Sequence, residues 1–143
     1  MESKVNGHDY MKYWRVVRRW AQDRYGLTYP MLEMLLFLYS EGKFSRTDFN
    51  EYSEIFPWRL KDFEKLREEG FVYRWRNRKG KEVALYALTP RAVGIIKSIY
   101  RKLNGEEAFS ETRGTMFSSN ARFRDKVLRN YIKKINKEIR SKG

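Results

Sequence analysis

The sequence predicts a mainly α-helical fold with one small β-hairpin. Three observations lead to this prediction. Apolar residues recur at helical spacing through most of the chain, one short stretch alternates β-prone and basic residues, and Gly and Pro separate the segments. A length of 143 residues, 41% hydrophobic and 16% aromatic, suits one compact domain or one domain with a helical extension.

The first two helices are predicted over residues 8–25 and 30–40. In the first, apolar side chains recur at helical spacing and form a broad aromatic face, and Gly26 ends the helix. Thr28 is the expected N-cap of the second helix, with Pro30 in its first turn. Because this second helix is apolar nearly all round, we expect it at the centre of the core.

Two shorter helices are expected next. Ser45 caps a third helix over residues 46–52, with Phe49 and Tyr52 facing inward. A fourth helix starts at Pro57 and ends at Gly70. Its inward stripe is Leu60, Phe63 and Leu66.

The hairpin is predicted from two β-prone runs, residues 71–76 and 83–88, joined by a basic turn over residues 77–81. Thr89 and Pro90 then begin a fifth helix. Its expected inward stripe consists of Val93, Ile96, Ile99, Tyr100 and Leu103.

The chain is predicted to end in a linker and a long helix. Residues 104–120 contain two glycines and several Ser and Thr residues, which indicates a linker or a frayed segment. A last helix over residues 121–140 carries a long apolar stripe opposite a strongly basic face.

The charge balance points to a polyanionic partner. Lys and Arg number 31 against 18 acidic residues, which gives a formal charge of +13 and a pI near 10.0. Each Lys or Arg placed on a phosphate releases a condensed counterion, so such an excess favours nucleic-acid binding. A merely well-solvated surface is the plainer alternative.

Other residue types argue against catalysis, cofactors and membranes. The chain has no cysteine and a single histidine, His8, so we expect no disulfide, metal site, catalytic triad or cofactor. Its longest apolar stretch, residues 31–39, is too short to span a bilayer, and no signal peptide is visible. We therefore expect a cytoplasmic protein that is not an enzyme.

The element order of several helices followed by a hairpin is that of a winged helix-turn-helix, which places a helix in the major groove of DNA. The fourth helix would read bases, the start of the third would hold phosphate, and the hairpin would grip the backbone or the minor groove. The predicted DNA-binding residues are Ser45, Arg46, Trp58, Arg59, Lys61, Asp62, Lys65, Arg74, Arg76, Arg78, Lys79 and Lys81. An ordinary amphipathic helix is the alternative for the fourth, because its charges cancel between residues 57 and 69.

Residues 10–103 resemble the MarR family of winged helix-turn-helix regulators. The resemblance rests on Gly26-Leu27-Thr28, on Pro57 through Leu66 to Gly70-Phe71-Val72, and on Tyr86-Ala87-Leu88-Thr89. It implies a homodimer in which the first and last helices of two subunits interlock while two winged domains read a pseudo-palindrome. In many members of the family a small aromatic or phenolic ligand binds between the dimer platform and the winged domain, where Trp14, Trp20 and Tyr25 would lie, although plain core packing is the better explanation of these residues. Gly80-Lys81-Glu82 in the wing and Ala92 depart from the family pattern.

The apolar faces of the first and last helices independently favour a partner, because one small domain offers them little surface to bury against. The predicted dimerisation residues are Tyr10, Trp14, Val17, Phe123, Val127, Leu128, Tyr131, Ile135 and Ile139. The expected division is a helical dimerisation region, residues 8–25 and 90–143, around a DNA-binding domain at residues 27–89. Alternatively, both helices fold back on their own domain.

Two other binding functions stay open. A winged fold also serves as a protein-interaction module, for instance on the transcription machinery. The exposed Trp58 expected at the start of a helix with zero net charge would suit that role. The third hypothesis is RNA or single-strand binding, with Tyr73, Trp75 and Tyr86 as stacking faces. Strand aromatics more commonly cover the core.

Overall fold

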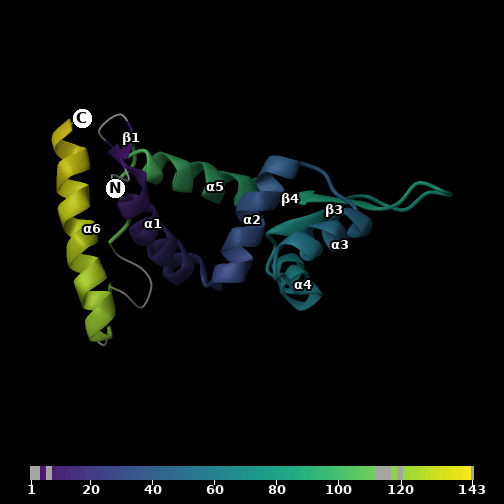
Figure 1. The fold of residues 1–143 in the computed structure, drawn as a ribbon, viewed down its shortest axis with the longest axis horizontal. Coiled ribbons are helices and arrows are strands. Elements are labelled where there is room, and N and C mark those ends of the chain that lie inside the picture. Colours follow the sequence, from purple (N-terminus) through teal and green to yellow (C-terminus); the bar gives the residue numbers. More distant parts are fainter. Residues whose placement is uncertain (1–3, 6–7, 112–116, 119–120, 143) are drawn as a thin grey trace. The chain divides into compact units, whose positions relative to one another are not determined.

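The computed structural model describes residues 4–5, 8–111, 117–118 and 121–142. It is mainly helical, as predicted, with the expected small antiparallel hairpin and a second, shorter pair of strands near the N-terminus (Figure 1). The chain forms two compact units, unit 1 (residues 1–27 with 97–143) and unit 2 (residues 28–96). Sequence analysis expected the second boundary at residue 90, whereas it falls within a helix after residue 96.

Unit 2 is built around helix α2 (Tyr29–Glu41), which begins where Thr28 accepts a hydrogen bond from the Met31 N–H. The buried side chains of α2 form one broad face of the helix, and Leu36 and Phe37 are half-buried beside it. The buried side chains are Met31, Leu32, Met34, Leu35 and Leu38. Helix α2 packs against both α4 (Leu60–Glu68) and β4 (Leu85–Leu88).

Helix α3 (Arg46–Ile55) begins with a capping box, in which Ser45 and Asp48 each accept a hydrogen bond from the other's backbone N–H. The helix runs three residues beyond the predicted end at Tyr52. Phe49 is buried as predicted, whereas Tyr52 is only half-buried. The cap therefore defines where α3 starts, directly beside the hairpin residues described below.

The hairpin joins strand β3 (Val72–Arg76) to β4 in antiparallel register, with Tyr73 opposite Ala87 and Arg74 opposite Tyr86. The register shifts between Arg74 and Arg76, so Trp75 is the extra residue of a β-bulge. On the other side of β4, Phe44 exchanges two backbone hydrogen bonds with Tyr86. This arrangement ties the hairpin to the segment between α2 and α3.

Helix α5 (Pro90–Leu103) follows the hairpin, and Thr89 caps it through the Ala92 N–H, as predicted. The Thr89 hydroxyl also donates to the Gly70 carbonyl at 2.8 Å, which fixes the end of α4 to the start of α5. Tyr100 was expected to face inward and is 43% exposed instead. Ile95, Ile96 and Ile99 supply the buried face.

Unit 1 contains helix α1 (Tyr10–Tyr25), which Gly26 ends in the left-handed conformation at φ 65°. The predicted start at His8 is wrong, because His8–Asp9 forms strand β2, paired with β1 (Lys4–Val5). Asp9 instead caps α1 by accepting from the Lys12 N–H. Short-range capping therefore set the start of this helix.

Helix α6 (Phe123–Lys142) packs against α1 and begins two residues later than predicted. Its fully buried Asn136 accepts from the Phe109 N–H at 2.7 Å and donates to the Phe109 carbonyl at 3.0 Å. The predicted linker at residues 104–120 has no α-helix in its described part, and residues 112–116 and 119–120 lie outside the described residues. No helix in the described part of the chain is long and apolar enough to span a bilayer.

Candidate functional site

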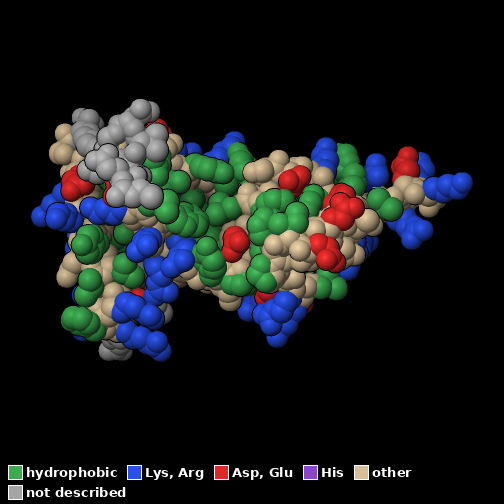
Figure 2. All heavy atoms as spheres, in the orientation of Figure 1, with side chains coloured by type: hydrophobic (Ala, Val, Ile, Leu, Met, Phe, Trp, Pro, Cys, Tyr) green, Lys and Arg blue, Asp and Glu red, His purple; other side chains and the backbone are tan. Residues whose placement is uncertain are grey.

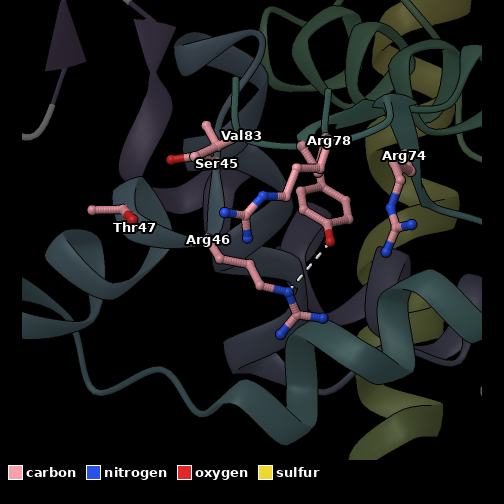
Figure 3. Close-up of a pocket in the computed structure, with 8 residues that line it drawn as sticks. Ser45, Arg46, Thr47, Arg74, Arg78 and Val83 are labelled. Carbon is pink, nitrogen blue, oxygen red and sulfur yellow. Dashed lines mark hydrogen bonds between the residues drawn. The ribbon is translucent and has the colours of Figure 1, made fainter. Parts of the chain in front are cut away.

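Helix α3 and the hairpin enclose a basic cavity of about 350 Å³ in unit 2 (Figure 3). Its lining residues come from the start of α3, from β3 with the hairpin turn, and from β4. They are Ser45, Arg46, Thr47, Arg74, Arg78, Val83, Ala84 and Tyr86. We call this group the arginine pocket.

Tyr86 organises the arginine pocket. Its side chain is 1% exposed, and its hydroxyl accepts a hydrogen bond from Arg46 Nε at 3.3 Å. Burial raises the pKa of Tyr86, but hydrogen bonds and positive charge from Arg46 and Arg74 outweigh it, and the net pKa falls below the ordinary value. The Arg74 guanidinium carbon lies 5.8 Å from the centre of the ring. Tyr86 therefore holds two guanidinium groups in fixed places.

Arg46 connects three elements at this point. Besides its bond from α3 to Tyr86 on β4, it forms an ion pair with Glu64 on α4 at 2.9 Å. The Tyr86 hydrogen bond, followed by smaller effects that include Glu64, raises the pKa of Arg46 above its already high value. Glu64 also contacts Arg67 at 3.4 Å, so its charge is shared between two guanidinium groups. The positive charge of the pocket is therefore only partly compensated.

A cluster of this kind is suited to bind a phosphate group. Guanidinium groups present planar, always charged donors that match phosphate oxygens in bidentate geometry. Thr47 lines the same cavity beside Ser45. Ser45 accepts from the Asp48 N–H with one lone pair of its oxygen, which still allows its hydroxyl proton to be donated to a phosphate.

The hairpin turn extends the basic surface beyond the arginine pocket. Arg78, Lys79 and Lys81 are exposed there, and Figure 2 shows Lys and Arg side chains gathered at the hairpin tip. Arg76 is half-buried and donates to the Val83 carbonyl at 3.0 Å, so it supports the turn. Paired backbone hydrogen bonds between Lys79 and Glu82 close the tip.

Helix α4 presents part of its predicted reading face. Arg59, Lys61 and Lys65 are exposed as expected. The prediction for Asp62 is wrong, because it is 6% exposed and accepts a hydrogen bond from Arg59 Nε at 3.2 Å. A carboxylate in the first turn of a helix is favoured by the helix dipole, which accounts for this inward pairing.

The prediction that Trp58 points outward is also wrong. Trp58 is 6% exposed and stacks on Phe56, with 4.5 Å between ring centroids, beside Phe37. The helix starts at Leu60 instead of Pro57, so Trp58 lies in an extended segment that turns its ring into this aromatic cluster. Leu60, expected inside, is 51% exposed because Trp58 supplies the inward side chain. The buried Trp58 removes the main support for a protein-interaction module on this helix.

The three predicted stacking aromatics differ in exposure. Tyr73 and Trp75 are 41% and 44% exposed on the hairpin. Tyr86 is buried, so its prediction as a stacking face is wrong. Its inward position follows from the register, which places it opposite Arg74 on the inner side of the hairpin.

The predicted dimerisation residues also differ in exposure. Phe123, Val127 and Tyr131 are exposed at four-residue spacing along α6, and Leu128 is half-buried. Val17 and Ile135 are buried in the single chain at 0% and 2% exposure, so they are not available to a partner as predicted. The remaining three, Tyr10, Trp14 and Ile139, are half-buried.

An open groove lies beside the exposed α6 residues in unit 1. Met11, which is 59% exposed, lines this groove of about 650 Å³ together with Leu128 and Tyr131. At the predicted ligand position, Trp20 donates to the Ser110 carbonyl and packs its ring edge-on against Phe109. Core packing therefore explains Trp20 without a ligand, in agreement with the preferred alternative from the sequence.

Sequence reasoning missed the organising role of Tyr86 and the participation of Thr47 and Glu64. The alternation of the second strand was a usable signal for Tyr86, because it places residues 86 and 88 on one face. Among the described residues, no group of three or more His, Asp or Glu side chains is placed to hold a metal ion. Comparison of the chain with protein-family models, with curated proteins and with solved structures gave no match.

Proposed function

We propose that this protein binds double-stranded DNA through unit 2, in the manner of a winged helix-turn-helix transcription regulator. The observation that carries the proposal is the convergence of Arg46, Arg74 and Arg78 in one cavity between α3 and the hairpin. A phosphate of the DNA backbone would occupy this cavity. The proposal assigns the protein a binding role, with no catalytic step.

The energetics of polyelectrolyte binding support a phosphate ligand. Three arginines in one pocket repel each other, and an anion between them relieves this repulsion while replacing condensed counterions on the DNA. Tyr86 holds Arg46 and Arg74 before any ligand arrives, which lowers the entropy lost on binding. The formal charge of +13 adds long-range attraction to the same partner.

The exposed side of α4 would provide base recognition. Lys61 and Lys65 lie four residues apart, hence on one face of the helix, and Arg59 precedes its first turn. Lysine and arginine are the usual partners of the guanine edge in the major groove. The Arg46–Glu64 ion pair joins this helix to the arginine pocket, so phosphate and base contacts would belong to one surface.

Selection from a random duplex library, followed by gel shifts, tests the proposal. We expect enrichment of a defined site, with Lys61→Ala relaxing the base preference. Lys79→Ala should weaken all duplexes alike and flatten the salt dependence by about 0.9 in log–log slope, since it removes one phosphate contact. Lys97→Ala, an exposed lysine on α5 outside unit 2, serves as the control and should change neither property. Failure to enrich any duplex at moderate salt would contradict the proposal.

We further propose that the protein acts as a homodimer through unit 1. Exposed Phe123, Val127 and Tyr131 form an apolar stripe on α6, and single chains rarely leave such stripes uncovered. Pairing of two copies would bring two DNA-reading surfaces together and double the contacts with a symmetric site.

A further inference from the structure

The two faces of the hairpin carry different chemistry. Arg74 and Tyr86 lie opposite each other and face the arginine pocket. Tyr73 pairs with Ala87 one residue away, so these two side chains project from the other face. We call the group of Tyr73, Trp75 and Lys43 the aromatic face.

Trp75 is an unusual feature of this surface. The structure describes all four tryptophans of the chain, and Trp75 is the most exposed of them at 44%. It is the extra residue of the β-bulge, and bulges commonly redirect a side chain near functional sites. Tyr73, at 41% exposure, is two residues away on the same strand. An exposed phenol and an exposed indole, the latter with one side covered by the Lys43 ammonium, present ring surface to a ligand.

Lys43 makes the same surface cationic. Its ammonium nitrogen lies 3.5 Å from the centre of the Trp75 ring. Phe44, its neighbour in the chain, pairs with Tyr86 across β4, which places Lys43 beside the strand that Trp75 faces. Arg76, which follows Trp75 on β3, is also basic, whereas Arg74 faces the arginine pocket. Flat rings bordered by positive charge match a ligand with flat rings and negative charge.

We propose that the aromatic face is a second binding site, for the bases of an unpaired nucleic-acid strand. Bases would stack on Trp75 and Tyr73 while Lys43 contacts the strand's phosphates. This goes beyond duplex recognition, because paired bases present only their edges in the grooves. The two faces of the hairpin would allow the protein to hold duplex and unpaired strand at once, as at a melted or frayed site.

Charge complementarity favours an unpaired strand over a protein segment as the occupant. An apolar peptide would gain from the ring surfaces but would leave Lys43 without an anion. Stacking on an aromatic side chain is worth about 1–3 kcal/mol per base and tolerates any sequence. A nucleic-acid strand offers bases that stack on the rings and phosphates that pair with Lys43.

Fluorescence anisotropy with a labelled oligothymidine of about 12 nucleotides tests this proposal, with a labelled duplex measured in parallel. We expect Trp75→Ala in the full chain to weaken single-strand binding about tenfold and duplex binding less than about twofold. Trp75→Phe should retain most of the affinity because it keeps a stacking ring. Lys43→Ala should lower the single-strand salt slope by about 0.7, whereas Trp75→Ala should leave that slope unchanged.

Intrinsic fluorescence gives a second readout on the unmodified oligonucleotide. Stacking on Trp75 should quench the emission of the wild-type protein, and the quenching should disappear in Trp75→Phe while binding persists. Tyr100→Ala on α5 is the matched control, since Tyr100 is 43% exposed outside the hairpin, and it should behave as wild type.

Several results would overturn the proposal. They are the absence of single-strand binding, unchanged single-strand affinity in Trp75→Ala, or equal losses for single strand and duplex. If an apolar peptide covered Trp75 and the oligothymidine did not displace it, the aromatic face would instead be a site for a protein. Duplex binding is measured independently with the same variants, so failure of this site and failure of the proposed DNA-binding function are distinguishable.

Discussion

At the scale of single residues, a buried tyrosine controls the placement of charged groups. Tyr86 is covered by the core, yet its hydroxyl reaches the arginine pocket and accepts from Arg46. The neutral ring tolerates burial, whereas an arginine in the same position would carry a large desolvation cost. A side chain of the core thereby holds an arginine side chain of the arginine pocket in place.

We expect Tyr86→Phe to weaken duplex binding about three- to tenfold, because Arg46 and Arg74 lose the acceptor that holds them in place. The ring and its packing are retained, so the fold should persist. Anisotropy titrations with the selected duplex measure the change, and circular dichroism checks the fold. Tyr73→Phe removes an exposed hydroxyl from the same hairpin and should leave duplex affinity unchanged. Equal behaviour of the two variants would show that Tyr86 only fills space.

At the scale of elements, polar side chains connect helices to segments without regular structure. Asn136 on α6 satisfies both backbone groups of Phe109. Two residues earlier in the chain, Glu107 accepts hydrogen bonds from Ser98, Arg101 and Lys102 on α5. Lys102 is 4% exposed and its ammonium lies 4.6 Å from the Trp20 ring centre. The segment after α5 is thus attached to α6 through Phe109 and to α5 through Glu107.

The Glu107 cluster predicts a pH-dependent stability. Burial raises the pKa of Glu107, but hydrogen bonds from Lys102, Ser98 and Arg101 outweigh it, so the net pKa lies below the ordinary 4.5. A carboxylate with a lowered pKa in the folded state stabilises the protein above its unfolded pKa, and this contribution disappears as the pH falls through the folded pKa. We expect Glu107→Gln to lower the free energy of unfolding by about 2 kcal/mol at pH 7, because Lys102 stays buried without its partner.

Chemical denaturation of wild type and Glu107→Gln at several pH values measures this effect. The two stabilities should converge as the pH drops below 4.5, where the wild-type carboxyl becomes protonated and resembles the amide. Glu106→Gln, an exposed neighbour, is the control and should stay close to wild type at every pH. A difference that is constant across the range would mean that the charge of Glu107 is irrelevant.

At the scale of the whole molecule, the surfaces that we propose for binding lie in different units. Unit 2 holds the arginine pocket and the aromatic face, and unit 1 carries the apolar stripe of α6. Apolar side chains at 41% to 83% exposure lower solubility unless they are covered. A second copy seated on this stripe would cover them.

We expect Phe123→Glu to convert the dimer into a monomer, because the substitution places a charge in the proposed apolar interface. Light scattering coupled to size exclusion measures the mass, and gel shifts with one and two half-sites measure the consequence. The variant should lose the preference for paired half-sites while it still binds one half-site. Met11→Glu tests whether α1 takes part in the same interface. Ile55→Glu, at an exposed apolar position of α3 outside unit 1, is the control and should remain dimeric. A wild-type protein that is monomeric at all concentrations would contradict the dimer.

Local sequence patterns were enough to predict the kind and order of most elements. Thr28, Ser45, Gly26 and Thr89 cap or end helices as predicted, and the β-prone runs form the hairpin. These features depend on interactions within a few residues, so the local pattern contains the information. The small β1–β2 pairing was missed because its strands are too short to show alternation.

Only the tertiary structure decided which side chains face outward and which come together. Trp58 faces inward because its ring packs in an aromatic cluster with Phe37 and Phe56. Leu60 is left exposed as a consequence. Arg46 meets Tyr86, 40 residues away, and Asn136 meets Phe109, 27 residues away. Such contacts depend on the packing of whole elements against each other, and periodicity along the chain does not encode that packing.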